Sequence, residues 1–119
     1  EYLESIGFRD IVVSIKSTNT QWMIENYRLW AKSCDIPTHL GVTEAGLLPD
    51  GVIKTRLAFE KLIPQGIGDT LRVSLTLNNS DKAEEITWGR QILKDIEAKK
   101  FRSCLRINQK SQSNYTKTN

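Results

Sequence analysis

The sequence of 119 residues has no long hydrophobic run. Its apolar residues come in short groups, whereas a helix that spans a bilayer needs about 20 in succession, so we expect no membrane contact. No charged and then apolar leader opens the sequence, and no secretory signal is visible. Because the first residue is not Met, we interpret the chain as starting within a longer protein.

Cysteine is also scarce. Cys34 and Cys104 lie 70 residues apart, and neither belongs to a pair with the spacing of a metal or redox motif. We therefore expect two reduced thiols, with neither a disulfide framework nor a metal site in this chain.

Acidic residues are absent after Glu97. Residues 1–99 hold all 14 acidic residues and 12 of the 17 Lys and Arg residues, so this part is close to neutral. We interpret residues 101–119 as a polar basic tail or linker without stable structure. We expect the tail to be passive, but a basic tail can also bind nucleic acid or an acidic surface. A non-catalytic binding module therefore remains an alternative.

The rest of the sequence alternates β-branched runs with stretches of helical periodicity. Three strand–helix pairs are predicted: 10–16 with about 20–34, 38–44 with about 51–63, and 70–76 with about 82–100. This alternation predicts an α/β fold with parallel strands, helices packed outside them, and all carboxyl ends on one face. We expect residues 1–100 to form three consecutive βα units of a partial (β/α)8 TIM-type barrel.

Three ionisable residues recur at equal spacing. Lys16, Glu44 and Arg72 follow one another at intervals of 28 residues, each at or near the end of its strand. Equivalent positions in successive βα units would place all three at one mouth of the sheet. The residues alone leave two interpretations open: a catalytic anion site, or a structural network in which Glu44 neutralises Lys16 or Arg72.

Side-chain alternation extends this set, because strand residues face opposite sides in turn and the helices must cover the apolar side. The inward-facing residues are then predicted to be Ser14, Lys16, Leu40, Val42, Glu44, Arg72 and Ser74. Thr43 and His39 would face outward. We interpret His39 as a structural residue near the opposite end of the barrel.

The inward polar residues suit anion chemistry. Arg72 can form two forked hydrogen bonds to a phosphate, and Lys16 supplies a compact charge to the same group. Ser74 can donate a hydroxyl hydrogen bond to a phosphate oxygen. Glu44, placed between the two cations, can act as a general acid or base.

Two motifs resemble a known family. The runs His-Leu-Gly-Val-Thr-Glu-Ala-Gly at 39–46 and Gly-Ile-Gly-Asp-Thr-Leu-Arg-Val-Ser-Leu at 66–75 look like those of the 4-hydroxy-3-methylbut-2-enyl diphosphate synthase family. Residues 14–19 also fit this family, and the resemblance covers about residues 8–98. The segment 55–60 departs from the family's small, Gly-containing pattern, and this leaves two interpretations open: diphosphate binding differs here, or the helix is packed differently.

The resemblance implies an iron–sulfur oxidoreductase of the non-mevalonate isoprenoid pathway. Members reductively open the ring of 2-C-methyl-D-erythritol 2,4-cyclodiphosphate and remove a hydroxyl. They bind this substrate in an N-terminal barrel and carry a [4Fe–4S] cluster in a C-terminal domain. Reduced ferredoxin or flavodoxin supplies electrons, and the partner subunit of a homodimer presents its cluster to the barrel. The implied location is the bacterial cytoplasm, or the plastid in a plant or alga.

For this chain the resemblance implies the C-terminal portion of that barrel, its sixth to eighth strands. Lys16, Arg72 and Ser74 correspond to diphosphate-binding positions, Thr43 lies beside the substrate, and Glu44 corresponds to a carboxylate that handles a proton. The cluster ligands have no counterpart here, so we expect the fragment alone to be inactive. Another phosphate- or pterin-binding barrel enzyme, such as a dihydropteroate synthase relative, is the alternative within enzymes.

Overall fold

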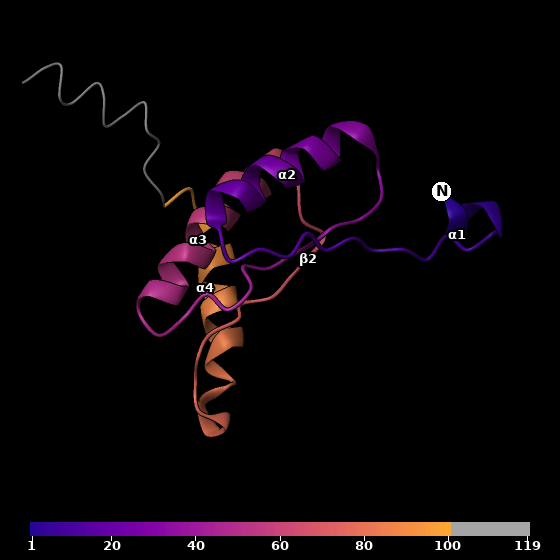
Figure 1. Cartoon of the computed structure of the whole chain (residues 1–119). Coiled ribbons are helices and arrows are strands. Elements are labelled where there is room, and N and C mark those ends of the chain that lie inside the picture. The colour runs from indigo at the N-terminus through magenta and orange to yellow at the C-terminus, as the bar shows by residue number, and fades with distance from the viewer. Residues whose placement is uncertain (101–119) are drawn as a thin grey trace, which may run out of the picture.

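The computed structural model describes residues 1–100 (Figure 1). Its elements in chain order are α1 (Tyr2–Ser5), α2 (Thr20–Ser33), β1 (His39–Leu40), α3 (Asp50–Leu62), the 3-10 turn η1 (Ile63–Gln65), β2 (Thr70–Leu71), the 3-10 turn η2 (Asn79–Asp81) and α4 (Glu84–Glu97). The three long helices were expected from the sequence, whereas α1, η1 and η2 were not. The expectations for Cys104 and for the tail lie outside the described residues.

Local signals fix where the helices begin and end. The Asn19 side chain accepts a hydrogen bond of 2.8 Å from the Trp22 N–H and so caps the first turn of α2. After α3, the turn η1 contains Pro64 and closes on Gly66, which has a left-handed φ of 76°. Gly66 accommodates this backbone because it has no Cβ, and the chain can then turn back toward β2.

Three extended segments lie side by side with parallel neighbours: a first segment at about 12–17, a middle segment at about 38–43 that contains β1, and a third segment at about 70–76 that contains β2. β1 pairs with β2, with His39 opposite Thr70 and Leu40 opposite Leu71. On its other side the middle segment forms parallel bridges between Thr38 and Val13 and between Val42 and Ser17. The structure is therefore a mixed α/β arrangement with parallel pairing, as the sequence predicted, but its regular strands are much shorter than the predicted seven residues.

A tyrosine hydroxyl explains one interruption of the strands. The Ile15 N–H donates to the Tyr27 hydroxyl over 2.9 Å, and the same hydroxyl donates to the His39 carbonyl. The ladder is intact on either side, where the His39 N–H donates to the Val13 carbonyl and the Thr43 N–H to the Ser17 carbonyl. The Tyr27 side chain of α2 thus replaces one backbone hydrogen bond of the ladder. As a result, the segment around Ile15 forms isolated bridges in place of a continuous strand.

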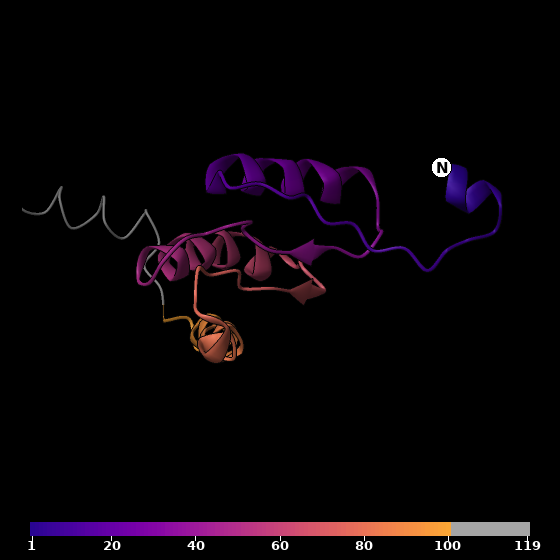
Figure 2. The ribbon, with the colours of Figure 1, turned by 60° about the horizontal axis from the view of Figure 1, so that its bottom comes forward.

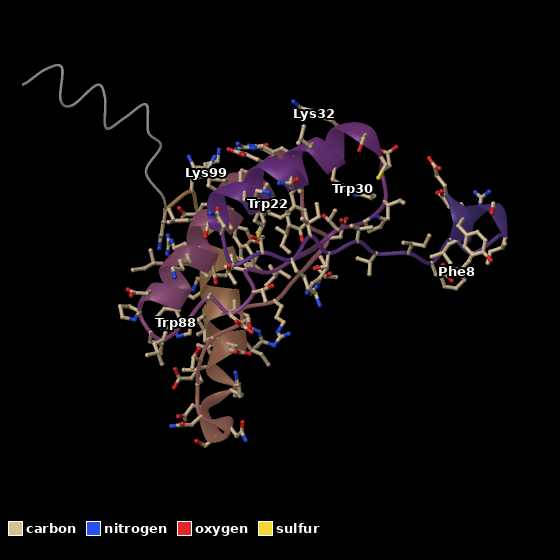
Figure 3. All side chains as sticks on the ribbon, viewed as in Figure 1. Phe8, Trp22, Trp30, Lys32, Trp88 and Lys99 are labelled. Carbon is tan, nitrogen blue, oxygen red and sulfur yellow. The ribbon has the colours of Figure 1, made fainter. Side chains whose placement is uncertain are left out.

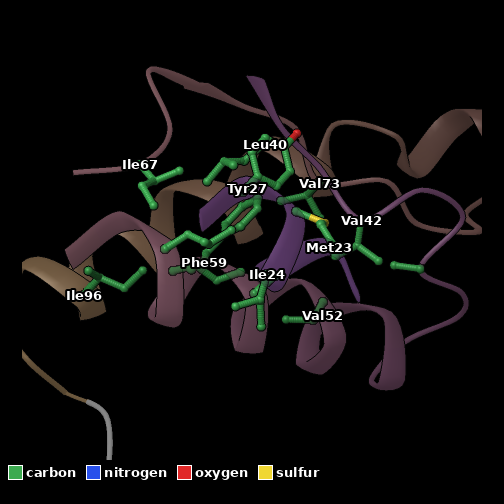
Figure 4. Packing of buried hydrophobic residues seen from close by; sticks show 14 of the residues in the cluster. Met23, Ile24, Tyr27, Leu40, Val42, Val52, Phe59, Ile67, Val73 and Ile96 are labelled. Carbon is green, nitrogen blue, oxygen red and sulfur yellow. The ribbon is translucent and has the colours of Figure 1, made fainter. Parts of the chain in front are cut away.

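One hydrophobic core joins the helices to the extended segments (Figure 4). Met23 and Tyr27 of α2, together with Phe59 of α3, are fully buried beside Leu40 and Val42. In the view of Figure 2 the helices α2, α3 and α4 follow one another in chain order. The opposite face of the extended segments has no helix over it among the described residues, and it is the face that holds the polar residues.

The tryptophans lie on the helices, as Figure 3 shows. Trp88 packs against the core, whereas Trp22 is about half exposed, with 48% of its surface accessible.

Candidate functional site

A small hollow lies on the helix-free face, formed by all three extended segments. Its lining residues are Ser14, Lys16, His39, Gly41, Val42, Thr43, Arg72 and Ser74. Four of the five residues expected in the site, Lys16, Thr43, Arg72 and Ser74, therefore meet in one place. The fifth, Glu44, does not line the hollow and is exposed directly beyond it in the chain.

Backbone hydrogen bonds hold these residues in register. The Arg72 N–H donates to the Leu40 carbonyl over 2.8 Å, and the Ala45 N–H donates to the Ser74 carbonyl over 3.1 Å. On the other side, the bond of 2.9 Å from the Thr43 N–H to the Ser17 carbonyl places Thr43 beside the end of the first segment. The ladder therefore fixes how the two cations are spaced across the middle segment.

The outer segments follow the predicted alternation. Val73 and Leu75 are buried in the core, and Leu71 is packed against it, so Arg72 and Ser74 face the hollow. In the first segment Ile15 packs against the core while Lys16 is exposed and lines the hollow.

The predicted register of the middle segment is wrong. Leu40 and Val42 are fully buried and belong to the core, whereas their neighbours His39, Gly41 and Thr43 are only partly buried and line the hollow. Val42 borders the hollow as well, but it has no exposed surface. The physical reason is the backbone at Glu44, which has a left-handed φ of 48° and ends the extended segment. Because Glu44 no longer belongs to the extended backbone, assigning residues to alternate faces starting from Glu44 puts every residue of the segment on the wrong face.

The sequence contained the signal for the correct register. In the outer segments the β-branched and aliphatic residues were assigned to the helix side, and the same rule applied to Leu40 and Val42 would have turned His39, Gly41 and Thr43 inward. Our interpretation of His39 as outward-facing is thus corrected, and Thr43 joins the cations without any turn of the backbone.

Gly41 keeps the middle of the hollow open. A Cβ at this position would lie 3.3 Å from the Arg72 carbonyl oxygen and 3.7 Å from the Arg72 Cβ. A side chain here would therefore press on the segment that carries Arg72. Its absence leaves free space between the side chains of His39 and Thr43, flanked by Lys16 and Arg72.

The charged pair Lys82 and Glu85 holds the outer edge of the third segment at Leu75, three residues after Arg72. The Leu75 N–H donates to Glu85 Oε1 over 2.8 Å, and Lys82 Nζ donates to the Leu75 carbonyl over 2.8 Å and to the same Glu85 oxygen over 3.1 Å. Burial raises the pKa of the Glu85 carboxyl, but these hydrogen bonds and the charges of Lys82 and Arg72 outweigh it and lower that pKa below its usual value. Glu85 and Lys82 thus hold the edge of the segment that carries Arg72.

The segment 55–60 does not line the hollow. Arg56 forms ion pairs with Glu60 of its own helix and, over 2.7 Å, with Asp95 of α4, and it also donates to the Lys100 carbonyl. The hydrogen bond with Glu60 is the main reason why the pKa of Arg56 is raised, and the hydrogen bond from Arg56 is the main reason why that of Asp95 is lowered. In this chain the departing segment joins α3 to the end of α4.

Residues 1–100 offer no cluster of three or more His, Cys, Asp and Glu side chains that could hold a metal ion. Cys34 is a half-buried free thiol. Cys34 is the one cysteine within residues 1–100, so this part of the chain does not fit an iron–sulfur cluster, which is held by several Cys thiolates. No helix in the described part of the chain is long and apolar enough to cross a bilayer.

The fold and the hollow define a class: an α/β protein with parallel strands, whose extended segments present two cations and three hydroxyls on one face. A family profile described as "GcpE TIM-barrel domain" matches residues 1–90. The chain belongs to the GcpE TIM-barrel domain family.

Three curated relatives share one name. A Rhodopirellula baltica protein is 52% identical over 108 residues, which cover 90% of this chain and 28% of the relative. A Clostridium acetobutylicum protein is 53% identical over 92 residues, covering 77% and 26%. A Corynebacterium efficiens protein is 50% identical over 93 residues, covering 78% and 24%. Each is named 4-hydroxy-3-methylbut-2-en-1-yl diphosphate synthase (flavodoxin). The chain spans about a quarter of the length of these relatives.

Proposed function

We propose that this chain is part of a 4-hydroxy-3-methylbut-2-en-1-yl diphosphate synthase, and that the hollow is one wall of the site for its cyclic diphosphate substrate. The observation that carries the proposal is the meeting of Lys16, Thr43, Arg72 and Ser74 in one hollow. Strand-end residues that face inward are the usual place for chemistry in a (β/α)8 barrel. The parallel pairing and the family membership support three βα units as the last part of such a barrel.

Each residue has a defined task in this proposal. Arg72 and Lys16 neutralise the diphosphate, Arg72 through its planar fork and Lys16 as a point charge. Ser74 donates its hydroxyl to a phosphate oxygen, and Thr43 contacts the substrate beside the same group. Glu44, exposed just past the end of the middle segment, exchanges a proton with the substrate during ring opening.

The reducing equivalents come from outside the described residues. A [4Fe–4S] cluster held elsewhere in the longer protein would supply electrons, with flavodoxin or ferredoxin as the donor. In the proposed homodimer the partner subunit brings the cluster to this wall. We place the reaction in the cytoplasm or in a plastid, and we expect this chain by itself to be inactive.

Steady-state kinetics of the longer enzyme that contains this chain test the proposal. Arg72→Ala should raise KM for the cyclic diphosphate by about tenfold or more, because a charge-assisted bond contributes about 1.5–3 kcal/mol. Glu44→Gln should lower kcat far more than it changes KM. Lys32→Ala, at an exposed position on α2 (Figure 3), is the matched control and should change neither. Unchanged KM in Arg72→Ala would reject the diphosphate assignment.

The binding module remains a second candidate because of the basic residues beyond position 99. Deleting residues 101–119 and measuring the salt dependence of nucleic-acid binding separates it from a passive linker.

A further inference from the structure

The geometry points to His39 as a further anion-binding residue: we propose that its Nε2 donates a hydrogen bond to the phosphate group held by Lys16 and Arg72, and that Thr70 positions its ring. This inference rests on the proposed function and adds a residue to the same site. It starts from the position of His39 among the residues that line the hollow.

One nitrogen of the ring is already held. His39 Nδ1 lies 2.8 Å from the Thr70 Oγ1, and the two residues are directly opposite each other in the β1–β2 pair. When the Thr70 hydroxyl donates to Nδ1, the proton of the neutral ring is on Nε2, which becomes a donor. Within residues 1–100 Nε2 has no protein partner, so it is available to a ligand.

The backbone N–H and carbonyl of His39 are also hydrogen-bonded. Its N–H donates to the Val13 carbonyl over 2.8 Å, and its carbonyl accepts the hydrogen bond from the buried Tyr27 hydroxyl. The ring is therefore fixed from both neighbouring segments. A donor that is fixed before binding loses little conformational freedom when an anion arrives.

The space next to the ring suits a phosphate group. Gly41, the next residue on the same face, has no side chain, so the ring of His39 borders an open volume with Thr43 on the far side. Lys16 and Arg72 line the same volume from the two flanking segments. His39 thus lines the hollow from the middle segment, and the two cations line it from the segments on either side.

Two amide substitutions separate a ligand role from a structural one. His39→Gln keeps an amide N–H close to the position of Nε2, whereas His39→Asn keeps one close to Nδ1 and can still pair with Thr70. The affinity of the longer enzyme for inorganic pyrophosphate is measured by titration calorimetry. We expect about a tenfold loss in His39→Asn and a much smaller loss in His39→Gln.

Further variants complete the test. Thr70→Val, which removes the positioning hydroxyl, should weaken binding less than His39→Asn, and Thr70→Ser should restore it. If His39→Asn binds pyrophosphate as the unmodified protein does, or if His39→Gln is the weaker of the two, the inference is wrong. Arg72→Ala is measured beside them: if it also leaves pyrophosphate affinity unchanged, the proposed function fails as well, whereas a loss confined to Arg72→Ala overturns the role of His39 alone.

Discussion

At the scale of single residues, the Tyr27 hydroxyl is the most consequential group that lies outside the hollow. It accepts the Ile15 N–H and donates to the His39 carbonyl, and its ring is fully buried in the core. The hydroxyl thus takes the place of a direct backbone hydrogen bond between Ile15 and His39. The residue therefore connects the core to the two segments that carry Lys16 and His39.

Tyr27→Phe tests this connection. The ring is retained, but a part-buried N–H and a part-buried carbonyl lose their partner, so we expect the free energy of unfolding to fall by about 1–3 kcal/mol in urea titrations. Tyr2→Phe, at a position with 77% of its surface exposed, is the control and should leave it unchanged. Equal stability of Tyr27→Phe and the unmodified protein would mean that the two segments close up and pair directly.

At the scale of elements, helices were predicted well and strands less so. α2 and α3 lie within about one residue of their predicted bounds, and α4 is shorter at both ends than its prediction. Helix signals are local, since periodicity and the cap at Asn19 act within one turn. Strand length depends on distant groups, such as the Tyr27 hydroxyl inserted at Ile15, and no local pattern encodes that contact.

The candidate site shows the same division. Lys16, Arg72 and Ser74 were placed on the correct face because buried aliphatic neighbours flank them in the sequence. The middle segment was misplaced because the left-handed φ of 48° at Glu44 carries no strong sequence signature in a residue other than Gly, Asn or Asp. His39 was missed because the alternation was counted from Glu44, although the aliphatic residues Leu40 and Val42 marked the helix side.

The start of α4 also has an effect on the third segment through Lys82 and Glu85. These side chains satisfy the Leu75 N–H and carbonyl, which point away from the middle segment. They take up the hydrogen-bonding groups of Leu75 that a neighbouring strand would use. A further strand can therefore pair with this edge before Leu75 in the sequence but not at Leu75 itself. The pair therefore sets how far any neighbouring strand extends beside Arg72.

Glu85→Gln tests the contribution of the charge. The pKa of Glu85 is lower in the folded protein than its usual 4.5, so ionisation stabilises the fold above that pH, and this stabilisation is lost as the pH falls through the folded pKa. We expect the unmodified protein to lose about 1 kcal/mol more than Glu85→Gln when urea unfolding is compared at pH 7 and pH 3. Glu84→Gln, next to it and exposed, is the control. A parallel pH dependence in Glu85→Gln and the unmodified protein would contradict the assignment.

At the scale of the whole molecule, the first extended segment has an open edge. The N–H groups of Val12, Ser14 and Lys16 point away from the middle segment, and none has a hydrogen-bond partner within residues 1–100, whereas the Val13 N–H donates to the Pro37 carbonyl. Apolar side chains are exposed nearby, among them Ile6, Phe8 and Val12. An open edge with apolar neighbours is a template for pairing with another strand.

We therefore expect the 119-residue chain, studied by itself, to associate through this edge, with a mass above that of one copy in light scattering at micromolar concentration. Val12→Pro removes an edge N–H without disturbing the ladder to the middle segment, and it should shift the chain toward the monomer. Val12→Ala removes apolar surface but keeps the N–H, so it should remain associated if backbone pairing is the cause. A monomeric unmodified chain, or a Val12→Pro chain that associates as strongly, would show that this edge is not the contact.

In the longer protein the same edge is free to pair with the strand that precedes it in the barrel we propose. There, Val12→Pro should lower the stability of the fold and leave the mass of the protein unchanged.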